Sequence, residues 1–142
     1  MYCVTNAIDE MDVNLIHTVL TNVYWSEGIP LSLLEKALGN SLCFAVITES
    51  KQQVGFARMI TDKATFAYLA DVFILPEYRG LGLSKLLMQA IVEHHELQNL
   101  RRTVLATRDA HGLYEQFGFK ALATPGTFME IWQPNVYQNM RD

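Results

Sequence analysis

Two glycines one residue apart, next to an arginine, form the stretch of this sequence best suited to binding an anion. The stretch reads Arg79, Gly80, Leu81, Gly82, Leu83 and Ser84. It follows an apolar run, Thr65 to Leu75, that predicts a buried strand, and apolar residues at helical spacing come after it. A glycine-rich turn at a helix start leaves backbone N–H groups uncovered at the positive end of the helix dipole. We therefore expect the stretch to bind a phosphate or pyrophosphate. A nucleotide P-loop is not expected, since no Gly-Lys-Ser/Thr follows.

An aspartate within the apolar run is the second residue that could do chemistry. Asp71 lies between Ala70 and Val72, and burying its charge costs free energy unless a partner neutralises it. Several roles stay open. The carboxylate could bind a substrate ammonium, accept a proton directly or through water, or have a structural role by pairing with Arg58 on the preceding strand or capping a backbone kink.

The hydrophobic pattern predicts the elements that position these residues. Apolar runs joined by short polar turns predict an antiparallel meander of Leu42–Thr48, Val54–Thr61 and Thr65–Leu75. A helix, Leu83–Leu97, then crosses to a strand that should be parallel to the third, Thr103–Thr107. The other predicted elements are a strand Tyr2–Asn6, a helix capped by Asn6 or Asp9, a helix from Pro30 or Ser32 to Gly39, a short helix His111–Phe117, and strands Lys120–Ala123 and Thr127–Trp132. The predicted fold class is α+β, a mixed and mostly antiparallel sheet of about six to seven strands flanked by about four helices.

Length and composition limit the class of protein. The 142 residues, half of them hydrophobic and 18% charged, predict a single globular domain over residues 1–142. A net charge of -4 argues against nucleic acid or an anionic membrane as the main partner. Cys3 and Cys43 are too few for a disulfide framework or a zinc site, and no metal site is expected. No signal peptide follows Met1 and no apolar run reaches membrane-spanning length, so we expect a cytoplasmic protein.

The stretch Arg79–Ser84 resembles the acetyl-CoA loop of the GCN5-related N-acetyltransferases (GNAT family), whose pattern is Gln/Arg-x-x-Gly-x-Gly/Ala. Ser84 departs from the final Gly or Ala, but serine is also small and its hydroxyl can itself meet a phosphate. A second segment, Asp109 to Phe119, resembles the family's short helix with a tyrosine followed by Gly-Phe. The resemblance is strongest from about Val54 to Phe119 and weakest in residues 1–40.

The resemblance implies an acyl-CoA N-acyltransferase fold in which acetyl-CoA is the cosubstrate. Residues Arg79 to Ser84 then hold its pyrophosphate, with Lys85 near an adenosine phosphate, and Phe73 and Ile74 offer backbone groups to the pantetheine arm and the acetyl carbonyl. The resemblance also implies that the Tyr114 hydroxyl lies near the sulfur and protonates the departing thiolate. The alternative for Tyr114 is a core tyrosine bonded to a backbone carbonyl.

The family usually builds part of the acceptor-substrate wall between its first two helices. The matching candidates here are Tyr24, Trp25 and Glu27, although Trp25 could instead pack at a hinge. Members that acetylate polyamines carry an acidic residue that matches Asp71, often with Glu just before it. Ala70 stands at that preceding position, which argues against polyamine specificity.

Taken together, the residues and the resemblance predict an acetyl-CoA-dependent N-acetyltransferase. A primary amine, of a small molecule rather than a peptide, would attack the thioester directly in a ternary complex, since neither cysteine lies in a motif suggesting an acyl-enzyme. The alternative is a non-catalytic acyl-CoA-binding sensor or interaction module on the same fold. Tyr114 favours the enzyme, because a binding protein needs no thiolate acid. Homodimers are common in the family, and a homodimer is also compatible with this sequence.

Overall fold

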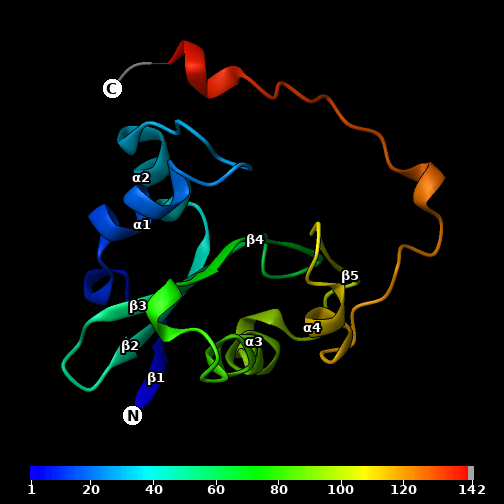
Figure 1. Cartoon of the computed structure of the whole chain (residues 1–142). Coiled ribbons are helices and arrows are strands. Elements are labelled where there is room, and N and C mark those ends of the chain that lie inside the picture. The colour runs from blue at the N-terminus through cyan, green and yellow to red at the C-terminus, as the bar shows by residue number, and fades with distance from the viewer. Residues whose placement is uncertain (141–142) are drawn as a thin grey trace.

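Five strands form one mixed sheet in the computed structural model, which describes residues 1–140 (Figure 1). Their order in the sheet is their order in the chain: β1 (Tyr2–Thr5), β2 (Leu42–Thr48), β3 (Gln53–Thr61), β4 (Phe66–Ile74) and β5 (Arg102–Leu105). Strands β1 to β4 are antiparallel neighbours, whereas β5 pairs with β4 in parallel. The predicted α+β class, the meander and the parallel pair are confirmed.

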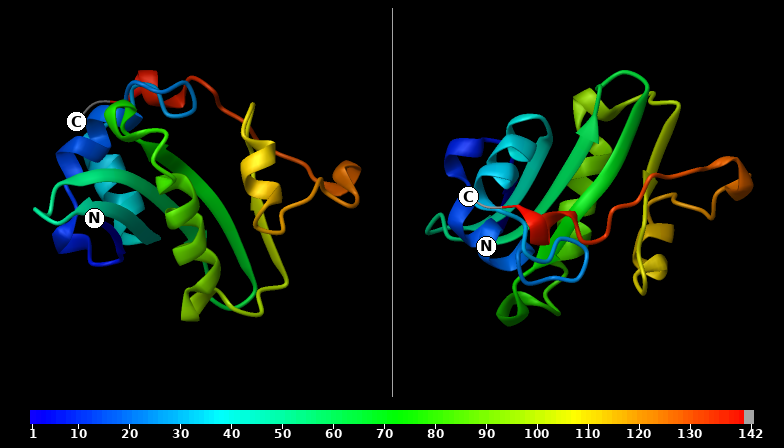
Figure 2. Two further views of the ribbon diagram at one scale, coloured as in Figure 1. Left: turned by 60° about the horizontal axis from the view of Figure 1, so that its bottom comes forward. Right: turned by 90° about the horizontal axis from the view of Figure 1, so that it is seen from above.

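Helices cover both faces of the sheet (Figure 2). They are α1 (Val13–Leu20), α2 (Leu31–Gly39), α3 (Leu83–Glu93) and α4 (His111–Glu115). Helices α1 and α2 pack on one face with a core that includes Ile16, Leu34 and Phe56, while α3 and α4 pack on the other with Phe44 and Leu87. No helix within residues 1–140 is both long enough and apolar enough to cross a bilayer.

Two predicted helix boundaries are wrong for local reasons. The cap of α1 is Asp12 rather than Asn6 or Asp9, because its carboxylate accepts the Leu15 N–H at 3.0 Å. Helix α3 ends at Glu93 because His94 has an extended backbone with ψ 133°. The His94 ring nitrogen Nδ1 then accepts the Glu96 N–H at 3.1 Å and begins a separate 3₁₀ turn.

Strand β4 has a bulge and an open edge at the candidate site. Arg58 pairs with Ala70 while Phe56 pairs with Phe73, so the strand carries a bulge at this point. Asp71 lies in the bulge with a left-handed φ of 59°. Parallel pairing with β5 ends at Leu69 and Leu105, although β4 continues to Ile74. The two strands therefore diverge, and the second half of β4, Ala70 to Ile74, has one edge without a strand partner among the described residues.

The two predicted C-terminal strands are wrong. Within the described chain, Lys120–Ala123 and Thr127–Trp132 pair with no strand, which leaves five strands instead of six to seven. A 3₁₀ turn, Pro125–Thr127, follows α4, and the chain then arches back to the side of α1 and α2, as the orange and red ribbon of Figure 1 shows. Tyr137 packs there against the core. The strand pattern is present in the sequence, but within residues 1–140 it pairs with no sheet edge.

Candidate functional site

The loop between β4 and α3 is shaped as an anion cradle. Gly80 and Gly82 have left-handed φ angles of 80° and 78°, which side chains rarely adopt. No atom lies within 4 Å of the position that a Cβ would take on either glycine. Gly82 caps α3 without any side-chain hydrogen bond, so the first N–H groups of that helix remain available.

A hollow of about 280 Å³ lies in front of this loop. Most of the predicted anion-binding residues line it: Arg79, Gly80, Gly82, Leu83, Ser84 and Lys85. Leu81 does not line it and is 56% exposed. The Arg79 Nε donates to the Ile74 carbonyl at 3.1 Å, which fixes the side chain beside the hollow. Two cations and a helix N-terminus therefore converge on one space, an arrangement that fits a diphosphate.

The open edge of β4 lies next to the hollow. The Leu75 N–H donates to the Val54 carbonyl at 2.9 Å, toward β3. Because backbone groups alternate along a strand, the N–H and C=O groups of Ile74 point away from β3, toward the open edge. The backbone groups of Val72 point toward the same open edge. Phe73 pairs instead with Phe56, and the two rings pack with centroids 5.9 Å apart. Sequence reasoning thus named Ile74 but missed Val72, since only the pairing register shows which residues face the open edge.

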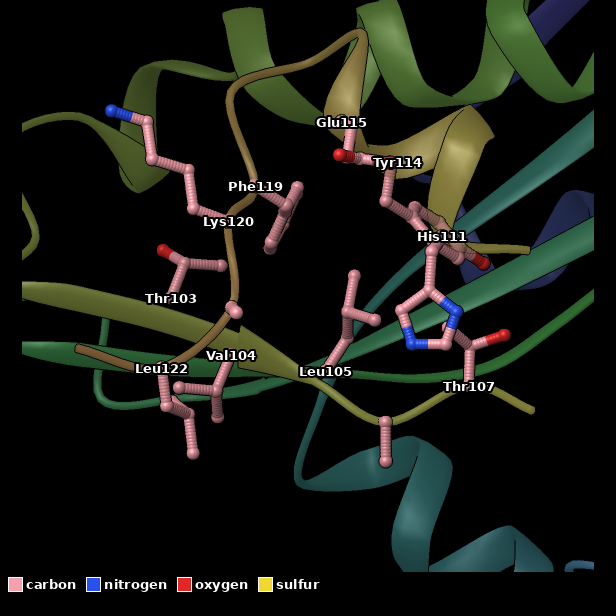
Figure 3. A pocket seen from close by; sticks show the side chains of 12 residues that line it. Thr103, Val104, Leu105, Thr107, His111, Tyr114, Glu115, Phe119, Lys120 and Leu122 are labelled. Atoms are coloured by element: carbon pink, nitrogen blue, oxygen red, sulfur yellow. The ribbon is translucent and has the colours of Figure 1, made fainter. Parts of the chain in front are cut away.

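Tyr114 lies on α4, beside the strand β5. It lines a second hollow, of about 410 Å³, together with His111, Leu105 and Thr107 (Figure 3). Its side chain is buried and meets the Phe119 ring edge to face at 6.0 Å. Its hydroxyl has no hydrogen-bond partner within residues 1–140, so the alternative of a bond to a backbone carbonyl is not realised. Burial and the nearby Asp109 carboxylate raise the pKa of the Tyr114 phenol, which keeps the proton on the oxygen.

The Asp71 carboxylate is held by two donors. Arg58 Nε donates to Oδ2 at 2.8 Å, and Trp25 Nε1 donates to Oδ1 at 3.0 Å. The Arg58 guanidinium also donates to the Ser41 hydroxyl at 3.2 Å. The side chain of Asp71 is 8% exposed, so the ion pair is largely shielded from water. Pairing with Arg58 was one of the roles left open for this aspartate, and the structure contains that pair.

The loop after α1 reaches across the diverging strands. Trp25 binds the β4 bulge through Asp71, and its ring meets Tyr24 edge to face at 5.1 Å. The Arg108 guanidinium, from the segment after β5, lies 3.5 Å from the centre of the Tyr24 ring. Glu27 is exposed on the same loop. Sequence reasoning missed Arg108, because nothing near it in the chain indicates a contact with Tyr24.

Comparison with known proteins agrees with this geometry. A family model for an acetyltransferase (GNAT) domain matches residues 40–121. A crystal structure from Xanthomonas campestris pv. campestris, assigned to the GNAT acetyltransferases, shares 46% identity and a TM-score of 0.94 over 98% of each chain. A Gibberella zeae protein assigned as an acetyltransferase is 34% identical over 73% of this chain and 70% of its own length. A crystal structure of a protein from Clostridium acetobutylicum, assigned as an acetyltransferase and solved with acetyl-CoA, has the same fold. Its TM-score is 0.67 at 16% identity, and the match covers 92% of this chain and 96% of that chain.

Proposed function

This chain belongs to the GNAT acetyltransferase family, and we propose that it acetylates the primary amine of a small molecule by direct attack in a ternary complex. Family membership supports an acetyl-CoA-dependent N-acetyltransferase. One observation carries the finer proposal: β4 and β5 diverge at a place that has the Arg79–Ser84 loop on one side and Tyr114 on the other. Residues Arg79 to Ser84 would hold the diphosphate of an extended acyl carrier bound along the open edge of β4, and Tyr114 would then lie near its thioester.

Acetyl-CoA supplies an activated acetyl group that an amine nitrogen can attack without a protein nucleophile. We assign the binding of the diphosphate to the loop Arg79–Ser84 and Lys85. We assign the binding of the pantetheine arm to the open edge of β4 at Val72 and Ile74, where the pantetheine would add as a strand does. Phe73 supports that edge from the core side. Cys43 is unsuited to attack a thioester, since burial raises the pKa of its thiol to about 11.

We assign Tyr114 the role of general acid. Its hydroxyl has no competing partner in the described chain, and its raised pKa keeps it protonated at neutral pH. It can therefore donate its proton to the leaving thiolate. The acceptor wall is assigned to Tyr24, Trp25 and Glu27, with the Glu27 carboxylate attracting the ammonium form of the amine.

Asp71 is better suited to positioning than to proton transfer. Its two oxygens already accept hydrogen bonds from Trp25 and Arg58, and its side chain is only 8% exposed. We therefore assign it the task of holding Trp25 over the bulge, and the proton of the attacking amine leaves through water.

The decisive variant is Tyr114→Phe. With free thiol as the readout across an amine panel, we expect kcat to fall by about 100-fold while KM for acetyl-CoA changes little. Tyr2→Phe, in β1 at the far edge of the sheet, is the matched control and should retain wild-type turnover. An unchanged kcat for Tyr114→Phe sinks the general-acid role, and bound acetyl-CoA without turnover of any amine sinks the small-molecule proposal.

Asp71→Asn tests the positioning role, because asparagine tolerates the left-handed backbone but carries no charge. We expect KM for the amine to rise by roughly tenfold, since Trp25 is less firmly held, while kcat changes by less than about threefold. The pH profile of kcat should keep its shape. Loss of the acidic limb of that profile, with a large fall in kcat, shows instead that Asp71 is the base.

A further inference from the structure

Four side chains form a continuous bridge between the two strands that diverge, β4 and β5. Asp71 lies in the bulge of β4, and its carboxylate accepts the Trp25 indole N–H at 3.0 Å. The Trp25 ring meets the Tyr24 ring edge to face, with centroids 5.1 Å apart. The centre of the Tyr24 ring in turn lies 3.5 Å from the Arg108 guanidinium, in the segment after β5. Arg108 is therefore the charged end of a bridge that spans the region assigned to the acceptor.

The charge of Arg108 is not paired in this structure. Within residues 1–140, no carboxylate forms an ion pair with its guanidinium, although Asp109 is its neighbour in the chain. Arg58 differs, because it is largely buried and the Asp71 carboxylate neutralises it at 2.8 Å. Stacking on an aromatic ring covers one face of a guanidinium and leaves the N–H donors at its edge open. Those donors match the two oxygens of a carboxylate.

The segment that carries Arg108 also leads to the proposed general acid. Thr107, the residue before Arg108, lines the hollow of His111 and Tyr114 (Figure 3). The Thr107 hydroxyl oxygen accepts the Ala110 N–H at 3.1 Å, which fixes the backbone between Arg108 and α4. Arg108 thus connects the acceptor wall, at Tyr24, with the helix of Tyr114.

The acceptor wall carries a negative charge as well. Glu27 is exposed on the loop of Tyr24 and Trp25, and no cation of the described residues forms an ion pair with it. One open carboxylate and one open guanidinium complement a molecule that has an ammonium group and a single carboxylate. A phosphate monoester fits less well, since it carries about two negative charges and Arg108 balances one of them.

We propose that Arg108 selects acceptor amines that carry a carboxylate, which it binds with the guanidinium edge that Tyr24 leaves open. The inference rests on the proposed N-acetyltransferase function and names its substrate class, an amino acid or a related aminocarboxylate. The Tyr24 ring holds the guanidinium plane in position. Because the carboxylate takes no part in the reaction, its contact with Arg108 is the same before and during acetyl transfer. The contact therefore lowers KM for the amine and leaves kcat nearly unchanged.

Paired acceptors test the selectivity of the wild-type protein. Release of free thiol from acetyl-CoA is measured with the protein amino acids, β-alanine and γ-aminobutyrate, each beside its carboxamide, and with phosphoethanolamine. We expect the best acceptor to be a carboxylate that exceeds its carboxamide by roughly tenfold in kcat/KM, mostly through KM. Added salt should weaken this preference, because Arg108 is exposed.

The other outcomes separate this inference from the proposed function. Carboxamides that equal or exceed their carboxylates overturn the selectivity, as does phosphoethanolamine as the best acceptor. Both results leave the N-acetyltransferase proposal standing. Protein that binds acetyl-CoA but releases thiol with no amine overturns the proposed function, and the inference with it.

Variants separate a binding role of Arg108 from a structural one. In Arg108→Gln we expect KM for the carboxylate to rise by roughly tenfold, with a far smaller change for the carboxamide. Arg108→Lys should regain part of the preference, since an ammonium keeps the charge but not the planar fork. Arg101→Gln removes an exposed charge just before the other end of β5, and this matched control should keep the wild-type preference. Equal losses for carboxylate and carboxamide in Arg108→Gln show that the stacked pair only supports the loop, and they overturn the proposal.

Discussion

The segment from β4 through α3 and the segment Thr127–Trp132, here called the C-terminal arm, differ in where their stabilising contacts come from. Strand β4 is hydrogen-bonded to β3 and, over its first half, to β5, and Leu87 of α3 is fully buried. The arm has a comparable density of apolar residues, yet Ile131 is 94% exposed. The turn before each segment is well formed, so turns do not explain the difference. A strand pattern becomes a strand only where an edge in reach accepts its backbone groups.

Substitutions of a glycine within the first segment and of a glycine just before the arm should have the most unequal effects. Gly82→Val forces a β-branched residue into a left-handed φ of 78°, which strains the loop and covers the helix N-terminus. We expect kcat/KM for acetyl-CoA to fall by more than roughly 100-fold. Gly126→Val, in the turn before the arm, meets no atom within 4 Å and needs no left-handed backbone, so we expect a change within roughly twofold.

Steady-state kinetics with varied acetyl-CoA measure both variants, and circular dichroism confirms that each is folded. If kcat/KM for acetyl-CoA falls equally in the two variants, the loop between β4 and α3 does not form the cofactor site.

Core truncations compare the two segments by stability. Leu87→Ala removes a fully buried side chain of α3, and we expect the free energy of unfolding to fall by about 2–5 kcal/mol. Ile131→Ala removes a side chain that is 94% exposed, and we expect a loss below about 0.5 kcal/mol. Urea unfolding of both variants provides the measurement. A loss above that value for Ile131→Ala shows that the arm packs within its own chain.

Local signals in the sequence predicted the parts of the fold that local contacts build. The glycine loop, the meander and the helix with Tyr114 follow from spacing and turn chemistry. The ion pair of Asp71 was named only among alternatives, because the charge of a strand residue indicates that a partner is needed but not which one. The contact between Arg108 and Tyr24 and the edge that faces Val72 depend on tertiary arrangement and register, which spacing does not encode. The last two strands were predicted wrongly because their alternating pattern is present in the sequence, but within residues 1–140 their backbone groups pair with no strand.

The smallest expected effect comes from a difference in charge between the turn before β4, which contains Asp62, and the turn Thr124–Thr127. The Asp62 carboxylate accepts the N–H groups of Ala64 at 2.9 Å and Thr65 at 2.7 Å, and hydrogen bonds from Thr65 hold the pKa of Asp62 well below its usual range. Because the folded state has the lower pKa, this carboxylate stabilises the fold above the usual aspartate value of about 3.9, and its contribution is lost as the pH falls through the depressed pKa. The turn before the arm has a neutral cap, in which the Thr127 hydroxyl donates to the Thr124 carbonyl at 2.7 Å. We therefore expect the stability difference between wild type and Asp62→Asn to be larger at pH 6 than at pH 3, and that for Thr127→Val to be equal at both. Urea midpoints at the two pH values measure this, and a pH-independent Asp62→Asn difference contradicts a charged cap on the turn before β4.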